Sequence, residues 1–123
     1  MGYRPNIVER SETEYGKQMW GFSYKVNTFH NVLWELGLEF DILNDDESVE
    51  IDAESIRNLN IDLDKASDEL KTSLLSTYCS DGDEPKISWD ELKECLNELI
   101  QDLKKALDTR YCKKYNVVRI EWF

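Results

Sequence analysis

Residues 88–109, SWDELKECLNELIQDLKKALDT, contain the longest helical pattern in the chain. Apolar residues recur at steps of three and four and make one continuous stripe: Leu92, Cys95, Leu96, Leu99, Ile100, Leu103 and Leu107. Ser88 and Glu91 have the spacing of a capping box, which marks the first turn of this helix. A helix of about 20 residues is about 30 Å long. It needs a partner surface along its whole length, so we expect it to be the spine of the fold.

Alternation of polar and apolar residues predicts five strands around this helix, over 5–10, 19–26, 38–43, 48–52 and 116–123. The first two are expected to pair as an antiparallel hairpin across a polar loop over 11–17. The turn Asn-Asp-Asp-Glu joins the next two into a second hairpin. The last strand is apolar on both faces. It is expected inside the sheet, because such a strand would promote aggregation at an open edge.

Two further helices are predicted, over 28–36 and 62–78, and residues 53–59 are expected to form a short helix or a turn. Gly37 is placed to end the first of these helices. His30 lies beside its apolar stripe and is expected at the surface or partly buried. The prediction is a single α+β domain over residues 1–123, with an antiparallel sheet of about five strands packed against three helices.

Charge is distributed unevenly along this chain, whose formal net charge is −11. Residues 1–37 carry no net charge, residues 38–108 carry −14 and residues 109–123 carry +3. A strongly negative field repels nucleic acid and anionic membranes and attracts basic surfaces. The composition therefore argues against direct binding of nucleic acid or membrane and favours a protein partner with a basic surface.

Two further features indicate a cytoplasmic protein. No apolar run approaches the roughly 18 residues of a membrane span, and the opening residues lack the apolar segment of a secretory signal. The three cysteines, Cys79, Cys95 and Cys112, are widely spaced and form no CxxC pair. They are expected to be reduced thiols, with Cys95 in the core of the long helix.

The chain has no motif that indicates catalysis or a cofactor. It contains no glycine-rich phosphate loop, no GxSxG and no HExxH. A single histidine and dispersed cysteines give no paired metal-ligand spacing, so neither a metal nor a cofactor is predicted. We expect a protein that is not an enzyme, with a small ligand-binding or enzymatic domain as the alternative.

The segment between the last two helices, CSDGDEPKISWDEL, resembles the loop and exiting helix of an EF-hand. A calcium loop needs oxygen ligands at positions 1, 3 and 5, glycine at 6 and glutamate at 12. Counted from Asp81, position 12 is Leu92; counted back from Glu91, position 6 is Pro85. The loop is out of register by one residue. This favours a solvated acidic loop and leaves a non-standard cation site over 80–85 as the alternative.

Carboxylates are densest over residues 39–54, where they form one acidic stretch: Glu39, Asp41, Asp45, Asp46, Glu47, Glu50, Asp52 and Glu54. They form either a solvated hairpin rim or a surface that docks on a basic patch of a partner. Trp34 and Trp89 both fall off the apolar stripes of their helices. An exposed Trp beside charge is typical of an interface anchor, and for Trp89 packing against a neighbouring element is favoured. The predicted partner-binding set is Glu39, Asp41, Asp45, Asp46, Glu47, Glu50, Asp52, Asp81, Asp83, Glu84 and Trp34.

The opening MGYRPNIVERSETEYG and the closing NVVRIEWF give the chain a resemblance to the small acidic α+β proteins of phages and mobile elements. It also resembles immunity proteins that neutralise toxins. The resemblance implies an inhibitor of anti-CRISPR, other anti-defence or toxin-immunity type, and it carries no functional residue across. The predicted function is a non-catalytic acidic inhibitor that binds a larger nucleic-acid-binding, toxin or defence protein through its negative surface.

Overall fold

The computed structural model describes residues 5–8, 15–18, 26–44, 47–78 and 87–122. Within these ranges five strands form one antiparallel sheet in the order β2-β1-β5-β4-β3. The strands are β1 Pro5–Val8, β2 Tyr15–Gln18, β3 Phe40–Ile42, β4 Val49–Asp52 and β5 Val117–Trp122. The closing strand β5 is therefore central, as its apolar sequence predicted, and the α+β class is confirmed.

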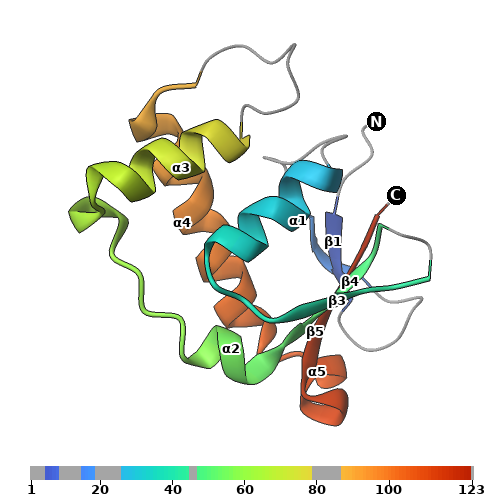
Figure 1. Ribbon diagram of the computed structural model, residues 1–123. Helices are drawn as coiled ribbons and strands as arrows, with labels where there is room; N and C mark the ends of the chain where they lie inside the picture. The colour runs from blue at the N-terminus through green and yellow to red at the C-terminus, as the bar shows by residue number, and fades with distance from the viewer. Residues whose placement is uncertain (1–4, 9–14, 19–25, 45–46, 79–86, 123) are drawn as a thin grey trace.

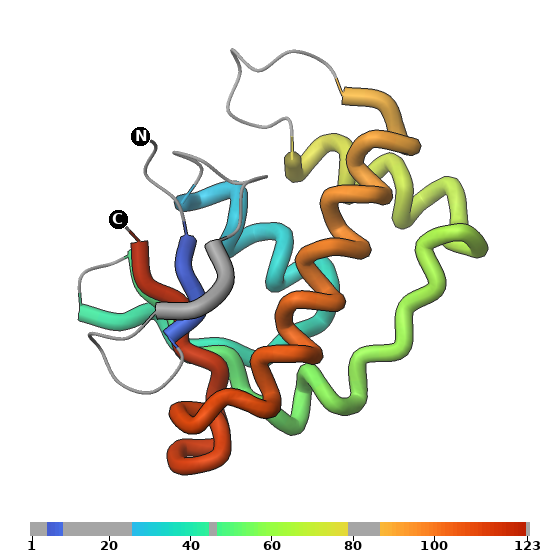
Figure 2. Tube along the Cα trace, turned by 180° about the vertical axis from the view of Figure 1, so that it is seen from behind, coloured from blue at the N-terminus to red at the C-terminus, as the bar shows by residue number. Residues whose placement is uncertain are grey.

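The helices gather mainly on one side of the sheet (Figure 1), and α4 runs the length of the molecule when seen from behind (Figure 2). They are α1 Val26–Glu35, α2 Ala53–Arg57, α3 Asp68–Tyr78, α4 Trp89–Ala106 and α5 Arg110–Tyr115, with a 3-10 turn at Leu63–Lys65. The core lies between the sheet and the helices. Strands β4 and β5 bury every second residue there, and the Phe29 ring of α1 meets the Trp122 ring edge-on, with ring centroids 5.6 Å apart.

The start of α4 follows the predicted capping box. Ser88 Oγ accepts a hydrogen bond from the Glu91 N–H at 3.2 Å, and the Ser88 hydroxyl donates to Glu91 Oε1 at 3.2 Å. Leu92, Leu96 and Leu103 are fully buried, so the apolar stripe of α4 is the spine of the core. Cys95 is partly buried against that core.

Four predicted elements of the strand regions have different boundaries in the structure. The loop expected over 11–17 contains strand β2, which is polar and is held by its ladder with β1 rather than by its own propensity. The strand expected over 19–26 falls mostly outside the described residues, and Val26 begins α1 instead of ending that strand. The two hairpin strands are shorter than predicted, but they pair as expected.

The helix expected over 62–78 is interrupted. Asp62 caps only a 3-10 turn, because Ala66 has an extended backbone with ψ 141° that ends it. The helix α3 then starts at Asp68, with Ser67 Oγ accepting from the Leu70 N–H at 3.2 Å. Two local side-chain to backbone bonds therefore begin two separate elements within a single apolar pattern.

The helix expected over 88–109 also ends early, at Ala106. Thr109 Oγ1 accepts from the Cys112 N–H at 3.2 Å and starts the separate helix α5, which was not predicted. The fold thus has five α-helices in its described part instead of three. No helix among the described residues is long and apolar enough to cross a membrane.

Candidate protein-binding surface

The acidic hairpin of β3 and β4 has two chemically distinct faces. Val49 and Ile51 of β4 are fully buried on the face that contacts the helices. Alternation along the strands therefore places Glu50 and its cross-strand partner Asp41 on the opposite, outer face. Glu50 also lies opposite Arg119 of the central strand, so this face carries charge where the other carries the core.

The structure brings four of the predicted binding residues together. They line a hollow of about 320 Å³ on the outer face, which we term the acidic hollow: Glu39, Phe40, Asp41, Glu50, Asp52 and Val117. Four carboxylates thus border one concave surface, although they come from two strands and the segment before them. The predicted hairpin already placed these carboxylates near one another, and the pairing of its two strands is confirmed.

The Glu50 carboxylate is held in a network with the central strand and α5. Its Oε2 accepts from the Tyr111 hydroxyl at 2.8 Å and lies 3.4 Å from Arg119 Nη1. Arg119 Nε also donates to Glu121 Oε2 at 2.7 Å. Burial lowers the pKa of Arg119, but its bonds to Tyr111 and Glu121 outweigh that effect and hold the pKa above its ordinary value. Glu50 is therefore a structural residue whose charge is largely matched.

Asp52 and Glu54 also have local partners. Asp52 Oδ2 accepts from the Ser55 N–H at 3.1 Å and caps α2, and Glu54 pairs with Arg57 at 3.0 Å on the surface. The backbone of Glu39 is fixed from both sides, since its N–H donates to Ser55 Oγ and its carbonyl accepts from the Asp52 N–H. These bonds make the wall of the hollow rigid.

Glu39 and Asp41 differ from the other carboxylates of the hollow. Both side chains are exposed, and within the described part of the chain neither carboxylate has an ion pair or a hydrogen bond. Among the described carboxylates that line the hollow, these are the two that a partner can reach without breaking a contact within the described chain.

His30 is buried, with 7% of its surface exposed, so the prediction of a surface or partly buried residue was wrong. Its Nε2 lies 2.8 Å from the carbonyl oxygen of Glu47, and its ring centroid lies 6.3 Å from that of Phe40. These contacts join α1 to β3 and to Glu47 at the end of the acidic hairpin, and the ring is buried between them. His30 thus positions the hairpin from the core side.

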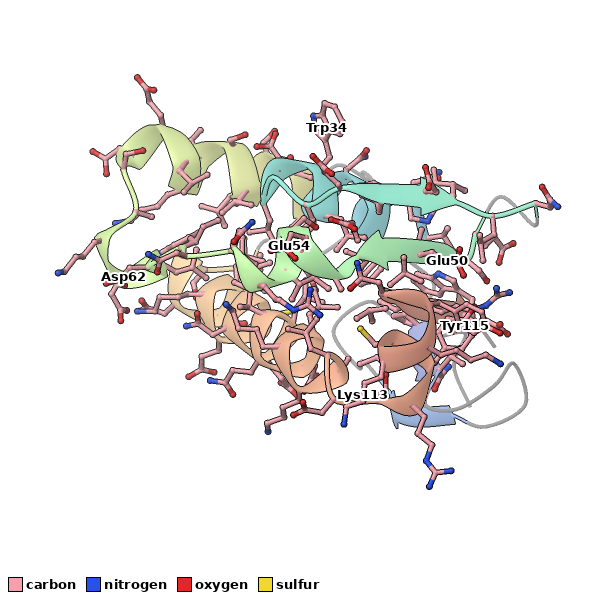
Figure 3. The ribbon with its side chains drawn as sticks, turned by 90° about the horizontal axis from the view of Figure 1, so that it is seen from below. Trp34, Glu50, Glu54, Asp62, Lys113 and Tyr115 are labelled. Atoms are coloured by element: carbon pink, nitrogen blue, oxygen red, sulfur yellow. The ribbon has the colours of Figure 1, made fainter. Side chains whose placement is uncertain are left out.

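Trp34 is the most exposed large apolar residue of the described chain, with 75% of its surface accessible. Figure 3 shows its ring projecting from α1 along the margin of the molecule where β3 also lies. Trp89, in contrast, is partly buried against the core, with Lys71 Nζ 5.8 Å from its ring centroid. The packing favoured for Trp89 is confirmed, and of these two tryptophans Trp34 is the exposed one.

A second concave surface was not predicted. A groove of about 690 Å³ lies between the end of α1 and α3, lined by Glu35, Asp68, Glu69, Thr72, Ser73, Ser76 and Thr77. Its hydroxyls recur at helical spacing, which is the one signal in the sequence that could have indicated a polar helix face there. The groove is open and contains no basic residue in its lining.

Several predicted residues lie outside the described residues: Asp45, Asp46, Asp81, Asp83 and Glu84, with the 80–85 cation alternative. Among the residues that the structure does describe, no group of three or more histidine, cysteine or acidic side chains could hold a metal ion. Acidic residues recur at four-residue steps along α4, at Asp90, Glu94, Glu98 and Asp102, but Asp102 is only 8% exposed. Asp102 is therefore buried rather than part of an exposed acidic face.

No family model, no curated protein and no solved structure matches the chain.

Proposed function

We propose that this protein is a non-catalytic inhibitor that binds a basic surface of a larger protein through the outer face of the β3–β4 hairpin. The observation that carries the proposal is the pair Glu39 and Asp41, which are exposed at the rim of the acidic hollow and have no partner among the residues that the structure describes. A carboxylate that is not matched within its own chain is available to a lysine or arginine of a partner.

Electrostatics and shape support the same class of partner. The chain carries a net charge of −11, which steers basic surfaces toward it over a longer range than direct contact. Trp34 adds a large apolar side chain at the margin where β3 lies. Interfaces combine such an aromatic anchor with charge that sets orientation. A basic groove that normally takes nucleic acid fits this chemistry, and its occupation by an acidic protein would block it.

The first prediction concerns the carboxylates of Glu39 and Asp41. The variant Glu39→Lys/Asp41→Lys is expected to weaken partner binding by at least about tenfold, because like charges then face each other across the interface. Its free energy of unfolding should stay within about 0.5 kcal/mol of the parent, as for most exposed substitutions. The partner is captured from the native host on the immobilised protein, identified, and its affinity measured by calorimetry.

The matched control is Glu94→Lys/Asp108→Lys, which changes the net charge equally at two exposed positions outside the hairpin. Glu50 is unsuitable for charge reversal, since it would break the contacts with Tyr111 and Arg119. If the control weakens binding as much as the hairpin variant, only net charge matters and the hairpin is not the site.

A further inference from the structure

The strand β3 forms one edge of the described sheet. It is last in the strand order and pairs only with β4, and Figure 3 shows it along the margin of the molecule. The direction of its backbone groups follows from two bonds to β4. Asp52 N–H donates to the Glu39 carbonyl at 2.8 Å, and Leu43 N–H donates to the Ser48 carbonyl at 2.7 Å.

Backbone groups of alternate residues point to opposite sides of an antiparallel strand. Glu39 and Leu43 bond toward β4, so Asp41 between them does the same. The N–H and C=O groups of Phe40 and Ile42 therefore point away from β4. Within the described part of the chain no group pairs with them. They form a short row of donors and acceptors that can accept another strand.

The side chains along this edge differ on its two faces. Asp41 is exposed on the outer face, beside the acidic hollow. Ile42 lies on the other face and is 50% exposed, although its cross-strand partner Val49 is fully buried. The edge therefore presents negative charge on one side and unburied apolar surface on the other.

We infer that β3 binds an extended segment of the partner as an added antiparallel strand, with basic and apolar side chains alternating along it. This rests on the proposed function and specifies how the partner is held. Residues directly opposite each other share a face of the sheet. A basic residue then lies opposite Asp41, and the apolar residues that flank it lie opposite Phe40 and Ile42, to which they also hydrogen-bond.

A second copy of this chain is a poor occupant of the same edge. A symmetric pairing centred on Asp41 places that carboxylate opposite its own symmetry mate, and Glu39 is exposed close by. Like charges directly opposite each other destabilise a strand pair. The charge that blocks self-association at this edge is the charge that selects a basic strand.

The test uses two capped heptapeptides, TKVKVKT and TEVEVET, titrated in large excess into the isotopically labelled full chain. With the lysine peptide, the backbone amide resonances of Phe40 and Ile42 should shift and their hydrogen exchange should slow. The glutamate peptide should bind at least about tenfold more weakly, because it places acid against acid. No change at Phe40 and Ile42 with the lysine peptide overturns the inference.

Methylation of the peptide backbone separates strand addition from simple charge attraction. In the proposed pairing the backbone N–H groups of the valines point toward β3 and those of the lysines point away from it. A peptide methylated on the backbone nitrogens of its valines should lose binding. The matched peptide, methylated on the backbone nitrogens of its lysines, should retain it. Equal affinity of the two peptides overturns strand addition. Dimerisation of the free protein that slows exchange at the same amides would assign the edge to a second copy and overturn it too.

Variants of β3 test strand addition with the captured partner as well. Ile42→Pro removes one outward N–H at an edge position, where proline is tolerated in a sheet, and Ile42→Thr keeps that N–H. If charge reversal at Glu39 and Asp41 abolishes partner binding while Ile42→Pro and Ile42→Thr bind alike, the proposed function stands and strand addition fails. If charge reversal has no effect, the proposed function itself fails.

Discussion

At the residue scale, Tyr111 decides how α5 is attached to the sheet. Its hydroxyl donates to Glu50 Oε2 at 2.8 Å and lies 3.4 Å from Arg119 Nη1, so one buried phenol contacts both charges of a cross-strand pair. Burial raises the pKa of Tyr111 above its ordinary value of 10.0, and the bond to Glu50 acts in the same direction, against the opposing effect of Arg119. The neutral phenol is therefore the form that the folded state prefers.

This preference predicts a loss of stability in alkali. A pKa that is raised on folding contributes stability that is fully present below the unfolded value and is lost as pH rises through the folded value. Urea unfolding between about pH 8 and pH 11 should show the decline beginning near pH 10, the ordinary tyrosine pKa. Tyr111→Phe should be less stable than the parent at pH 8 but should lose less on the way to pH 11. Parallel curves for the two proteins would contradict this role of Tyr111.

At the element scale, α4 begins at a capping box, in which Ser88 caps the first turn of the helix. Ser88 and Glu91 exchange two hydrogen bonds across the first turn, and Asp90 and Glu91 place negative charge at the positive end of the helix dipole. Because α4 buries Leu92, Leu96 and Leu103 in the core, weakening its first turn is expected to lower the stability of the fold.

Ser88→Ala is therefore expected to lower the free energy of unfolding by about 1 kcal/mol. Chemical denaturation gives the value. The matched control is Gln101→Ala at an exposed position on the same helix, which should change stability by less than about 0.5 kcal/mol. A Ser88→Ala protein as stable as the control would show that packing alone defines the start of α4.

At the scale of the whole molecule, the net charge of −11 acts on the rate of association more than on the contacts themselves. We predict that the association rate with the captured partner falls at least about tenfold between 0.01 M and 1 M salt, where the screening length shrinks from about 30 Å to about 3 Å. The dissociation rate should change less. Stopped-flow mixing measures both rates. An association rate that does not depend on salt would contradict electrostatic steering of the partner.

Periodicity in the sequence determined the class of the fold and most of its elements. The apolar stripe and the capping box of α4 follow from the spacing of its residues. The central position of β5 follows from the apolar residues on both of its faces. Gly37 ends α1 as expected, with φ +81°. The separation of Asp62 from α3 and of Thr109 from α4 could not be predicted, because each depends on a competition between local caps and a continuing helix.

For the candidate site, the sequence determined the charges and the tertiary structure determined how they are paired. The sequence determined that residues 39–54 are acidic, and that Trp34 falls off an apolar stripe. Only the tertiary structure decided which of those charges are matched. Glu50 meets Arg119 from a strand 69 positions away in the chain, Asp52 caps a helix, and Glu39 and Asp41 remain exposed beside an open sheet edge. The physical reason is that charge is a property of a residue, whereas the neutralisation of that charge depends on neighbours that folding brings from elsewhere in the chain.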